Sequence, residues 1–172
     1  AKGIEADLEA VVKRSRGVAN QLKAGVTHLM KKNKITVHMG EGTLTGPTSL
    51  TVKGEKGEEN LTAKHVIVAT GARARDLPFA PTDGKRVWTY RHAMTPPEMP
   101  TKLLVIGSGA IGIEFASFYN DMGAEVTVVE MLDRVVPVED ADVSAFLEKA
   151  LTKQGMTIRT SAGVEELKVG PK

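Results

Sequence analysis

The spacing of apolar side chains in the first part of the chain is that of a helix. They recur at intervals of three and four, at Leu8, Val11, Val12, Val18, Ala19, Leu22, Val26, Leu29 and Met30. This period predicts one long amphipathic helix from Ile4 to Met30. Gly17 and Gly25 each weaken such a helix by about 1 kcal/mol relative to Ala. The basic run Lys31–Lys34 suits the negative C-terminal end of the predicted helix.

The pattern then shortens to runs typical of β-strands. Ile35–Met39 predicts a short strand. Leu50–Val52 and Leu61–Ala63 flank a turn at Gly54–Asn60, which indicates a β-hairpin or meander. The continuous apolar run His65–Ala69 predicts a buried, parallel strand.

Residues 76–100 interrupt the pattern. They contain Asp83-Gly84 and five prolines, Pro78, Pro81, Pro96, Pro97 and Pro100. This composition predicts a connection between two domains. Trp88, the single tryptophan of the chain, is interpreted as the packing anchor of this connection.

After Pro100 the pattern alternates between strand and helix. The predicted strands are Lys102–Ile106, Glu125–Val129 and Met156–Thr160. The predicted helices are Ala110–Met122 and a second one, capped by Asp140 or Asp142, that runs to about Gln154. This order is typical of βαβαβ units, so the predicted fold class is α/β with a parallel sheet.

Composition removes several function classes. The chain has 172 residues with 23 basic and 21 acidic side chains, a balance that argues against a nucleic-acid partner. It has no cysteine, which excludes a disulfide, a thiolate metal site or a dithiol redox centre within it. The four histidines lack metal-site spacing, so no metal is predicted. No apolar run is long enough for a membrane span, and no membrane partner is expected.

A glycine motif joins the first of these strands to the helix that follows it. Gly107 permits a tight turn, Gly109 lets a pyrophosphate approach the backbone, and Gly112 lets the helix pack close to the sheet. The free N–H groups at the helix start, including those of Ala110 and Ile111, then face the phosphates. The strand and helix on either side make the motif more specific than GxGxxG alone.

An acid ends the next predicted strand. Glu130 lies 23 positions after Gly107. Its carboxylate can accept hydrogen bonds from both ribose hydroxyls and repels a 2′-phosphate, so NAD is favoured over NADP. Two alternatives stay open: FAD in the same site, or a glycine turn that holds no ligand.

The residues around the glycine motif and Glu130, called the fingerprint below, are more specific still. The segments Gly107–Glu114, Gly123–Glu130 and Pro137–Asp140 resemble the NAD-binding part of dihydrolipoamide dehydrogenases, which are flavin disulfide reductases. Val66–Ala72 resembles the ATG motif of that family, which closes over FAD, and His38–Gly42 resembles its loop beside the FAD adenine. The resemblance covers essentially the whole chain.

The resemblance implies a Rossmann-like α/β fold with a parallel sheet and a β-meander, in two incomplete dinucleotide-binding domains of the FAD/NAD(P)-binding type. Residues 1–80 are expected to be the rear of the FAD domain, 81–100 the connection, and 101–172 the front half of the NAD domain. The implied cofactor contacts are Gly40, Thr70, Gly71 and Ala72 for FAD, and Gly107, Gly109, Ala110, Ile111, Gly112, Glu114 and Glu130 for NAD.

Glu114 has two interpretations. The resemblance places it facing the nicotinamide and the flavin. The physical alternative is an acid in the first turn that stabilises the helix N-terminus by about 0.3–1 kcal/mol.

For the complete protein the resemblance implies NAD-dependent reoxidation of dihydrolipoamide. The expected setting is a homodimer that serves 2-oxo acid dehydrogenase complexes in a bacterial cytoplasm or the mitochondrial matrix. The family's N-terminal glycine motif, CxxxxC pair and C-terminal His–Glu pair are absent here. We therefore expect an internal fragment without catalytic residues, inactive alone and with an incomplete FAD site. The alternatives are a mercuric or glutathione-type reductase, or a non-catalytic nucleotide-binding module.

Overall fold

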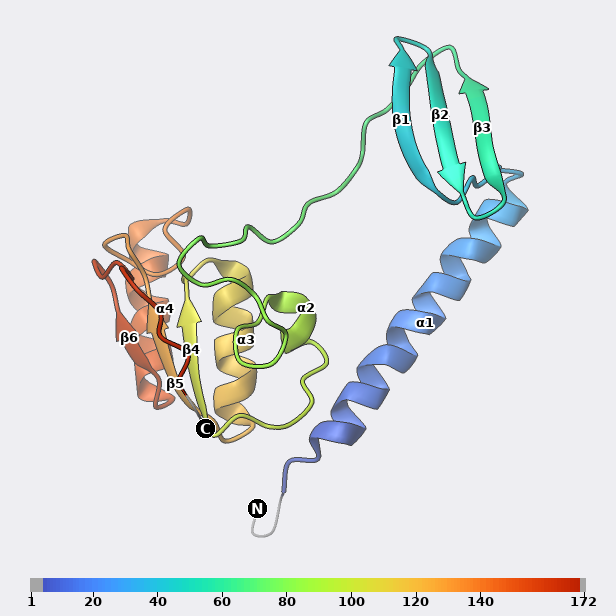
Figure 1. The fold of residues 1–172 in the computed structure, drawn as a ribbon. Helices are drawn as coiled ribbons and strands as arrows, with labels where there is room; N and C mark the ends of the chain where they lie inside the picture. Colours follow the sequence, from blue (N-terminus) through green and yellow to red (C-terminus); the bar gives the residue numbers. More distant parts are fainter. Residues whose placement is uncertain (1–4, 171–172) are drawn as a thin grey trace. The chain divides into compact units, whose positions relative to one another are not determined.

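The computed structural model describes residues 5–170, which form two compact units, one of residues 13–73 and one of residues 5–12 and 74–170 (Figure 1). The helices are α1 (Leu8–Lys32), α2 (Tyr90–Ala93), α3 (Ala110–Asp121) and α4 (Ala141–Lys153). The strands are β1 (Glu41–Gly46), β2 (Ser49–Gly54), β3 (Gly57–Thr62), β4 (Lys102–Ile106), β5 (Glu125–Val129) and β6 (Thr157–Arg159).

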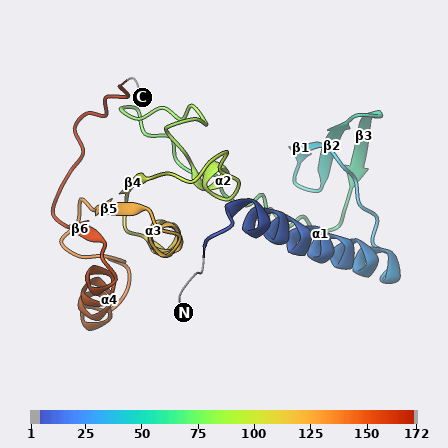
Figure 2. The same ribbon diagram turned by 90° about the horizontal axis from the view of Figure 1, so that it is seen from below.

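The later strands form a parallel sheet in the order β4-β5-β6. Helices α3 and α4 lie on the same side of this sheet (Figure 2), as expected when two right-handed crossovers run in the same direction. Val105 pairs with Val128, and Val128 pairs with Ile158. The α/β fold with a parallel sheet is therefore confirmed, with β6 one residue shorter at each end than predicted.

The apolar core lies between the parallel sheet and its helices. Val126 and Val128 of β5 are buried beneath Ala116 and Tyr119 of α3, together with Ile113, Ala124, Val135, Val136, Leu151 and Met156. The opposite face of the sheet is more open, since Leu104 of β4 is 47% exposed. Asp140 caps α4, because its side chain accepts a hydrogen bond from the N–H of Asp142. That contact decides between the two predicted caps.

The proline-rich segment packs against this core and contains the short helix α2, which the sequence pattern did not predict. The Trp88 ring lies 6.3 Å from that of Tyr119, and its indole N–H donates to the Lys85 carbonyl at 2.9 Å. Tyr119 donates to the Ala93 carbonyl at 2.7 Å. The interpretation of Trp88 as a packing anchor is confirmed, while the predicted domain boundaries stay predictions.

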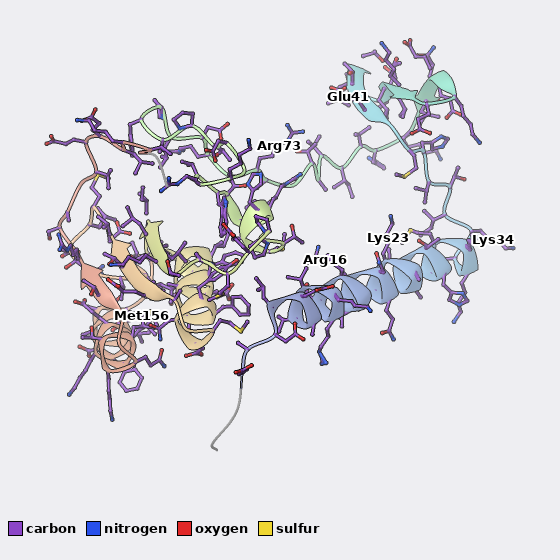
Figure 3. All side chains as sticks on the ribbon, turned by 60° about the horizontal axis from the view of Figure 1, so that its bottom comes forward. Arg16, Lys23, Lys34, Glu41, Arg73 and Met156 are labelled. Carbon is purple, nitrogen blue, oxygen red and sulfur yellow. The ribbon has the colours of Figure 1, made fainter. Side chains whose placement is uncertain are left out.

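The long predicted helix is present as α1. Asp7 caps it, with its side chain accepting from the N–H of Ala10 at 2.9 Å. The predicted start at Ile4 lies outside the described residues, and the helix ends at Lys32 rather than Met30. None of its residues is buried, and side chains such as Lys23 project from it (Figure 3). None of the helices in the described part of the chain has the length and apolar character needed to cross a membrane.

The predicted meander is also confirmed, as an antiparallel sheet in the order β1-β2-β3. The turn between β2 and β3 is tighter than the predicted Gly54–Asn60, because Gly54 already pairs with Gly57. Strand β1 was missed because Leu44 is its only large apolar residue. Val52 of β2 is the one buried hydrophobic residue among the described residues of this unit.

Two predicted strands are wrong. Ile35–Met39 and His65–Ala69 are not part of any strand, and they leave Ile67 89% and Val68 67% exposed. A strand exists only where a neighbouring strand satisfies its N–H and C=O groups. No described strand pairs with either segment. The apolar pattern signals a tendency to be buried, but it supplies no partner.

Candidate nucleotide-binding site

A glycine loop at the carboxyl end of β4 joins this strand to α3. Gly107 has φ of +99°, in the left-handed region that favours glycine. Its N–H donates to the Val129 carbonyl at 2.9 Å, which extends the pairing of β4 with β5 by one residue. The loop therefore starts at a fixed point at the sheet edge, as the sequence predicted.

The other two fingerprint glycines have different environments. A Cβ at Gly112 would overlap the carbonyl oxygen of Gly107, so the close approach of α3 to the loop requires glycine there. A Cβ at Gly109 would meet no atom within 4 Å. Gly109 also has the ordinary φ of −63°. Nothing inside the described chain demands a glycine at position 109, which is the position expected to face a pyrophosphate.

Helix α3 begins beside this open position without a side-chain cap. Gly109 is its N-cap residue, and Ala110 and Ile111 of the first turn are exposed. N–H groups at an uncapped helix start are donors for an anion, and the helix dipole adds to the attraction. No acid lies in the first turn. Because Glu114 is the fifth helical residue and exposed, its interpretation as a first-turn acid is wrong.

Glu130 follows β5 and lies beside the glycine loop. Its side chain is buried, with 8% of the residue exposed. Oε2 accepts hydrogen bonds from both the N–H and the hydroxyl of Ser108, each at 2.8 Å. Oε1 accepts one from the N–H of Leu132 at 2.9 Å. One carboxylate thus links the glycine loop to the loop that follows β5.

These contacts determine the charge of Glu130. Burial raises the pKa of its carboxyl group, but the N–H of Leu132 and the two donors of Ser108 outweigh burial and lower the pKa overall, with a smaller contribution from the N–H of Met131. The carboxylate is therefore ionised at neutral pH. It is a buried negative charge held only by neutral donors.

The loop after β5 is tied to the same place. Val136 is buried with φ of +40°, an uncommon conformation for a β-branched residue. Its N–H donates to the Ser108 carbonyl at 3.0 Å. Ser108 is itself fully buried, and sequence reasoning passed over it because it occupies a variable position of the motif. The available signal was a polar residue between two fingerprint glycines, with an acid at the next strand end.

The residues expected to contact FAD lie in the other unit. A Cβ at Gly40 would overlap the backbone of Lys53, so packing within that unit already requires glycine at position 40. Thr70, Gly71 and Ala72 are exposed, and Gly71 has φ of +75°. No hydrogen bond among the described residues links Gly40 to Thr70–Ala72. The expected NAD residues thus lie within one unit, where Glu130 bonds to the glycine loop, while the four expected FAD residues belong to the other unit.

The sequence profile of the pyridine nucleotide-disulphide oxidoreductases matches residues 1–172. The chain belongs to this family. A dihydrolipoyl dehydrogenase of Zymomonas mobilis is 54% identical over 162 residues, which is 94% of this chain and 35% of the relative. Dihydrolipoyl dehydrogenases of Rhizobium etli and Bacillus subtilis are 49% and 42% identical, over 38% and 36% of their lengths. This chain is thus homologous to dihydrolipoyl dehydrogenases and spans about a third of their length.

Solved structures agree with the family. The crystal structure of LpdA from Mycobacterium tuberculosis has a TM-score of 0.86 at 31% identity, with 95% of this chain and 37% of that one covered. A copper complex of a variant of the HOCl-induced flavoprotein disulfide reductase RclA from Escherichia coli has a TM-score of 0.85 at 27% identity, covering 96% and 38%. The predicted FAD/NAD(P)-binding fold is therefore confirmed.

Proposed function

We propose that the β4–α3–β5 part of the chain binds NAD⁺. The observation that carries this proposal is the buried, ionised carboxylate of Glu130 beside a glycine loop that is open at Gly109. A lone glycine turn needs no acid next to it, and burial of an unpaired charge is costly. An acid that reads ribose hydroxyls accounts for its presence.

Different residues of the site bind different parts of the ligand. The uncapped N–H groups at the start of α3 bind the pyrophosphate, with Gly109 leaving room for it. Glu130 accepts from the adenosine ribose and disfavours NADP through charge repulsion. Glu114 lies one turn into α3 and is exposed, in keeping with a position near the nicotinamide. When bound, the nicotinamide supplies the hydride acceptor, while these residues supply orientation and electrostatics.

Calorimetric titration of the chain with NAD⁺ and NADP⁺ tests this proposal. We expect NAD⁺ to bind more tightly than NADP⁺. E130A should reduce the ratio of the two affinities by roughly tenfold or more, as expected when a hydrogen bond to a charged group is lost. E125A is the matched control, because it removes an exposed acid from the same strand region. An unchanged NAD⁺/NADP⁺ ratio in E130A would show that Glu130 does not read the ribose.

We propose that, in a protein as long as its relatives, this chain is one part of an NAD-linked dihydrolipoyl dehydrogenase. Identity of 54% to one such enzyme supports this over a non-catalytic module, and Glu130 disfavours the NADP-using reductases. FAD, when bound, relays electrons between a dithiol and the nicotinamide, with contacts at Gly40 and Thr70–Ala72 of this chain. The chain has no cysteine to form that dithiol.

The same proposal places residues 1–80 in the FAD domain and residues 101–172 in the NAD domain. It also implies a homodimer that works with 2-oxo acid dehydrogenase complexes. Relatives of the chain come from bacteria such as Zymomonas mobilis, and one, from Schizosaccharomyces pombe, is named as mitochondrial. This range supports a bacterial cytoplasm or a mitochondrial matrix as the place of action.

A chimera tests the enzymatic part. This chain would replace the matching third of the Zymomonas mobilis relative, and NAD⁺ reduction by dihydrolipoamide and flavin absorbance would be measured. We expect a yellow protein with NAD-linked turnover, and none from the 172-residue chain alone. The matched chimera with E130A should keep its flavin and lose affinity for NAD⁺. A chimera with bound flavin and no turnover would contradict the proposed enzyme.

A further inference from the structure

We propose that Ser108 is a positioning residue for the nucleotide: it holds Oε2 of Glu130, so that Oε1 alone is left to read the ribose. The inference rests on the proposed NAD⁺ site and makes it more specific. The fingerprint alone suggests that both carboxylate oxygens serve the ribose, and the hydrogen bonds around Glu130 argue against that division.

The argument starts from the capacity of a carboxylate. Each oxygen has about two acceptor positions. The N–H and the hydroxyl of Ser108 both point at Oε2, at 2.8 Å each, and fill it. Oε1 has the N–H of Leu132 at 2.9 Å, and the N–H of Met131 makes only the smallest contribution at this carboxylate, so Oε1 keeps a position for a ligand. One ribose hydroxyl can therefore donate to Glu130 without displacing a protein donor, and it must do so at Oε1.

Ser108 is well placed to hold this arrangement. It is fully buried, so water does not compete for its hydroxyl. Its carbonyl accepts the N–H of Val136, whose strained φ of +40° is kept in place at that point. The residue thus connects the glycine loop, the acid and the loop after β5. Without its hydroxyl, the Glu130 side chain would gain an unfilled acceptor and rotational freedom.

No charged neighbour offers another explanation for the position of Glu130. The charged residues next to it are Asp133 and Arg134 on the following loop and Arg159 of β6, whose carbonyl accepts the Glu130 N–H at 2.8 Å. Among the described residues none forms an ion pair with Glu130, and Arg134 lies 3.9 Å from Asp133 instead. The orientation of the carboxylate therefore depends on neutral donors, of which Ser108 supplies two.

A double-mutant cycle tests the inference. The affinity for NAD⁺ would be measured for the wild-type chain, S108A, E130Q and the double variant. We expect S108A to weaken binding roughly three- to tenfold, the size of a lost hydrogen bond to a charged group. In the E130Q background S108A should cause no further loss. S144A is the control, since Ser144 is equally buried but its hydroxyl bonds to the Val136 carbonyl.

Titration of the Glu130 carboxyl by carbon NMR adds a readout that needs no ligand. Its midpoint should move upward in S108A and stay in place in S144A. S108C, which keeps a hydrogen-bond donor at this position but a weaker one on a somewhat larger atom, should fall between serine and alanine in both measurements, and it replaces S108A if that variant does not fold.

The outcomes separate the two proposals. Equal losses from S108A in both backgrounds would show a packing effect and overturn the positioning role. Unchanged NAD⁺ affinity in S108A would overturn it as well, while leaving the NAD⁺ site intact. No binding of NAD⁺ by the wild-type chain would overturn the proposed site, and the role of Ser108 with it.

Discussion

Two apolar runs of this chain look alike in sequence and differ in structure. Leu103–Ile106 and Val66–Ala69 are both continuous runs of aliphatic residues, and each leads to a glycine with a left-handed φ, Gly107 at +99° and Gly71 at +75°. The first run is strand β4, paired with β5 and covered by α3. The second run is extended and exposed, with no strand pairing to it among the described residues.

The difference shows what an apolar run does and does not encode. Its composition makes exposure unfavourable in both places, at about 25 cal/mol per Å² of apolar surface. Such a run becomes buried, even in part, only where the same chain also supplies the neighbours, as β5 and α3 do for Leu103 and Val105 of β4. Helix α1 repeats the lesson, because it has a regular apolar stripe and yet Leu22 is 66% exposed. The chain spans about a third of its relatives' length, so in a chimera of that length other segments can supply such neighbours.

The largest change in stability is expected at the glycines that follow the first run, Leu103–Ile106. G112A places a Cβ against the Gly107 carbonyl and should destabilise the β4–α3 turn by about 1–3 kcal/mol or more. G109A meets open space at an ordinary φ, but alanine is a poorer N-cap than glycine, so this loss offsets the entropy gain of about 0.4–1 kcal/mol and the stability of the fold should change little. Thermal unfolding and NAD⁺ titration of both variants measure this contrast.

The same pair also separates fold from binding. G109A should weaken NAD⁺ binding although its fold is little changed in stability, because its Cβ lies where the pyrophosphate is proposed to approach. Equal affinity of G109A and the wild type would place the pyrophosphate elsewhere.

A pair of valines tests the comparison, one in the second run and one in β5, the strand that pairs with the first run. Val128 is fully buried, so V128A should lower the free energy of unfolding by about 1.5–3 kcal/mol. Val68 is 67% exposed, so V68A should change it by less than about 0.5 kcal/mol. In the chimera the cost of V68A should rise towards that of V128A. If V68A stays neutral there, its run is exposed in the longer protein too.

Sequence reasoning succeeded where local chemistry was sufficient. The strands Lys102–Ile106 and Glu125–Val129 were predicted to the residue, because each is bounded by residues that end strands and flanked by helix signals. It failed at Ile35–Met39 and at α2, where long-range pairing or packing decides the outcome. At the site it found Glu130 but missed Ser108, because a hydrogen bond over 22 positions leaves no periodic signal.

A smaller change in stability is expected where residues 76–100, the segment between the two runs, pack against the core. Y119F removes the hydroxyl that donates to Ala93, and should cost about 1 kcal/mol. Y90F, which affects only an exposed hydrogen bond with Arg91, should change stability little. Unfolding in denaturant measures both. Equal effects would mean that the Ala93 contact does not hold the segment.

Tyr119 also predicts an alkaline limit. Burial raises the pKa of its hydroxyl from 10.0 to about 12. Because the unfolded chain ionises first, the stability due to this residue is fully present below pH 10 and is lost as the pH rises towards about 12. The wild type should therefore approach Y119F in stability over that range.

The smallest effect is expected at the turn after Asp83, within the same segment. One oxygen of Asp83 accepts the N–H groups of Lys85, Arg86 and Val87, each at 2.8 Å. The N–H of Val87, then those of Arg86 and Lys85, lower the pKa of this carboxyl from 3.8 to about 2. A lowered pKa means that the stabilisation is present above pH 3.8 and is lost as the pH falls to about 2. D83N keeps an acceptor oxygen but not the charge, so its melting temperature should lie slightly below that of the wild type at neutral pH and meet it near pH 2.

Because Asp83 is exposed, solvent screens the interaction and the difference in melting temperature should shrink in high salt. D76N is the control, since it removes an exposed acid of the same segment for which no hydrogen bond is found among the described residues. A gap between D83N and the wild type that is constant with pH would show that the turn depends on geometry and not on the charge of Asp83.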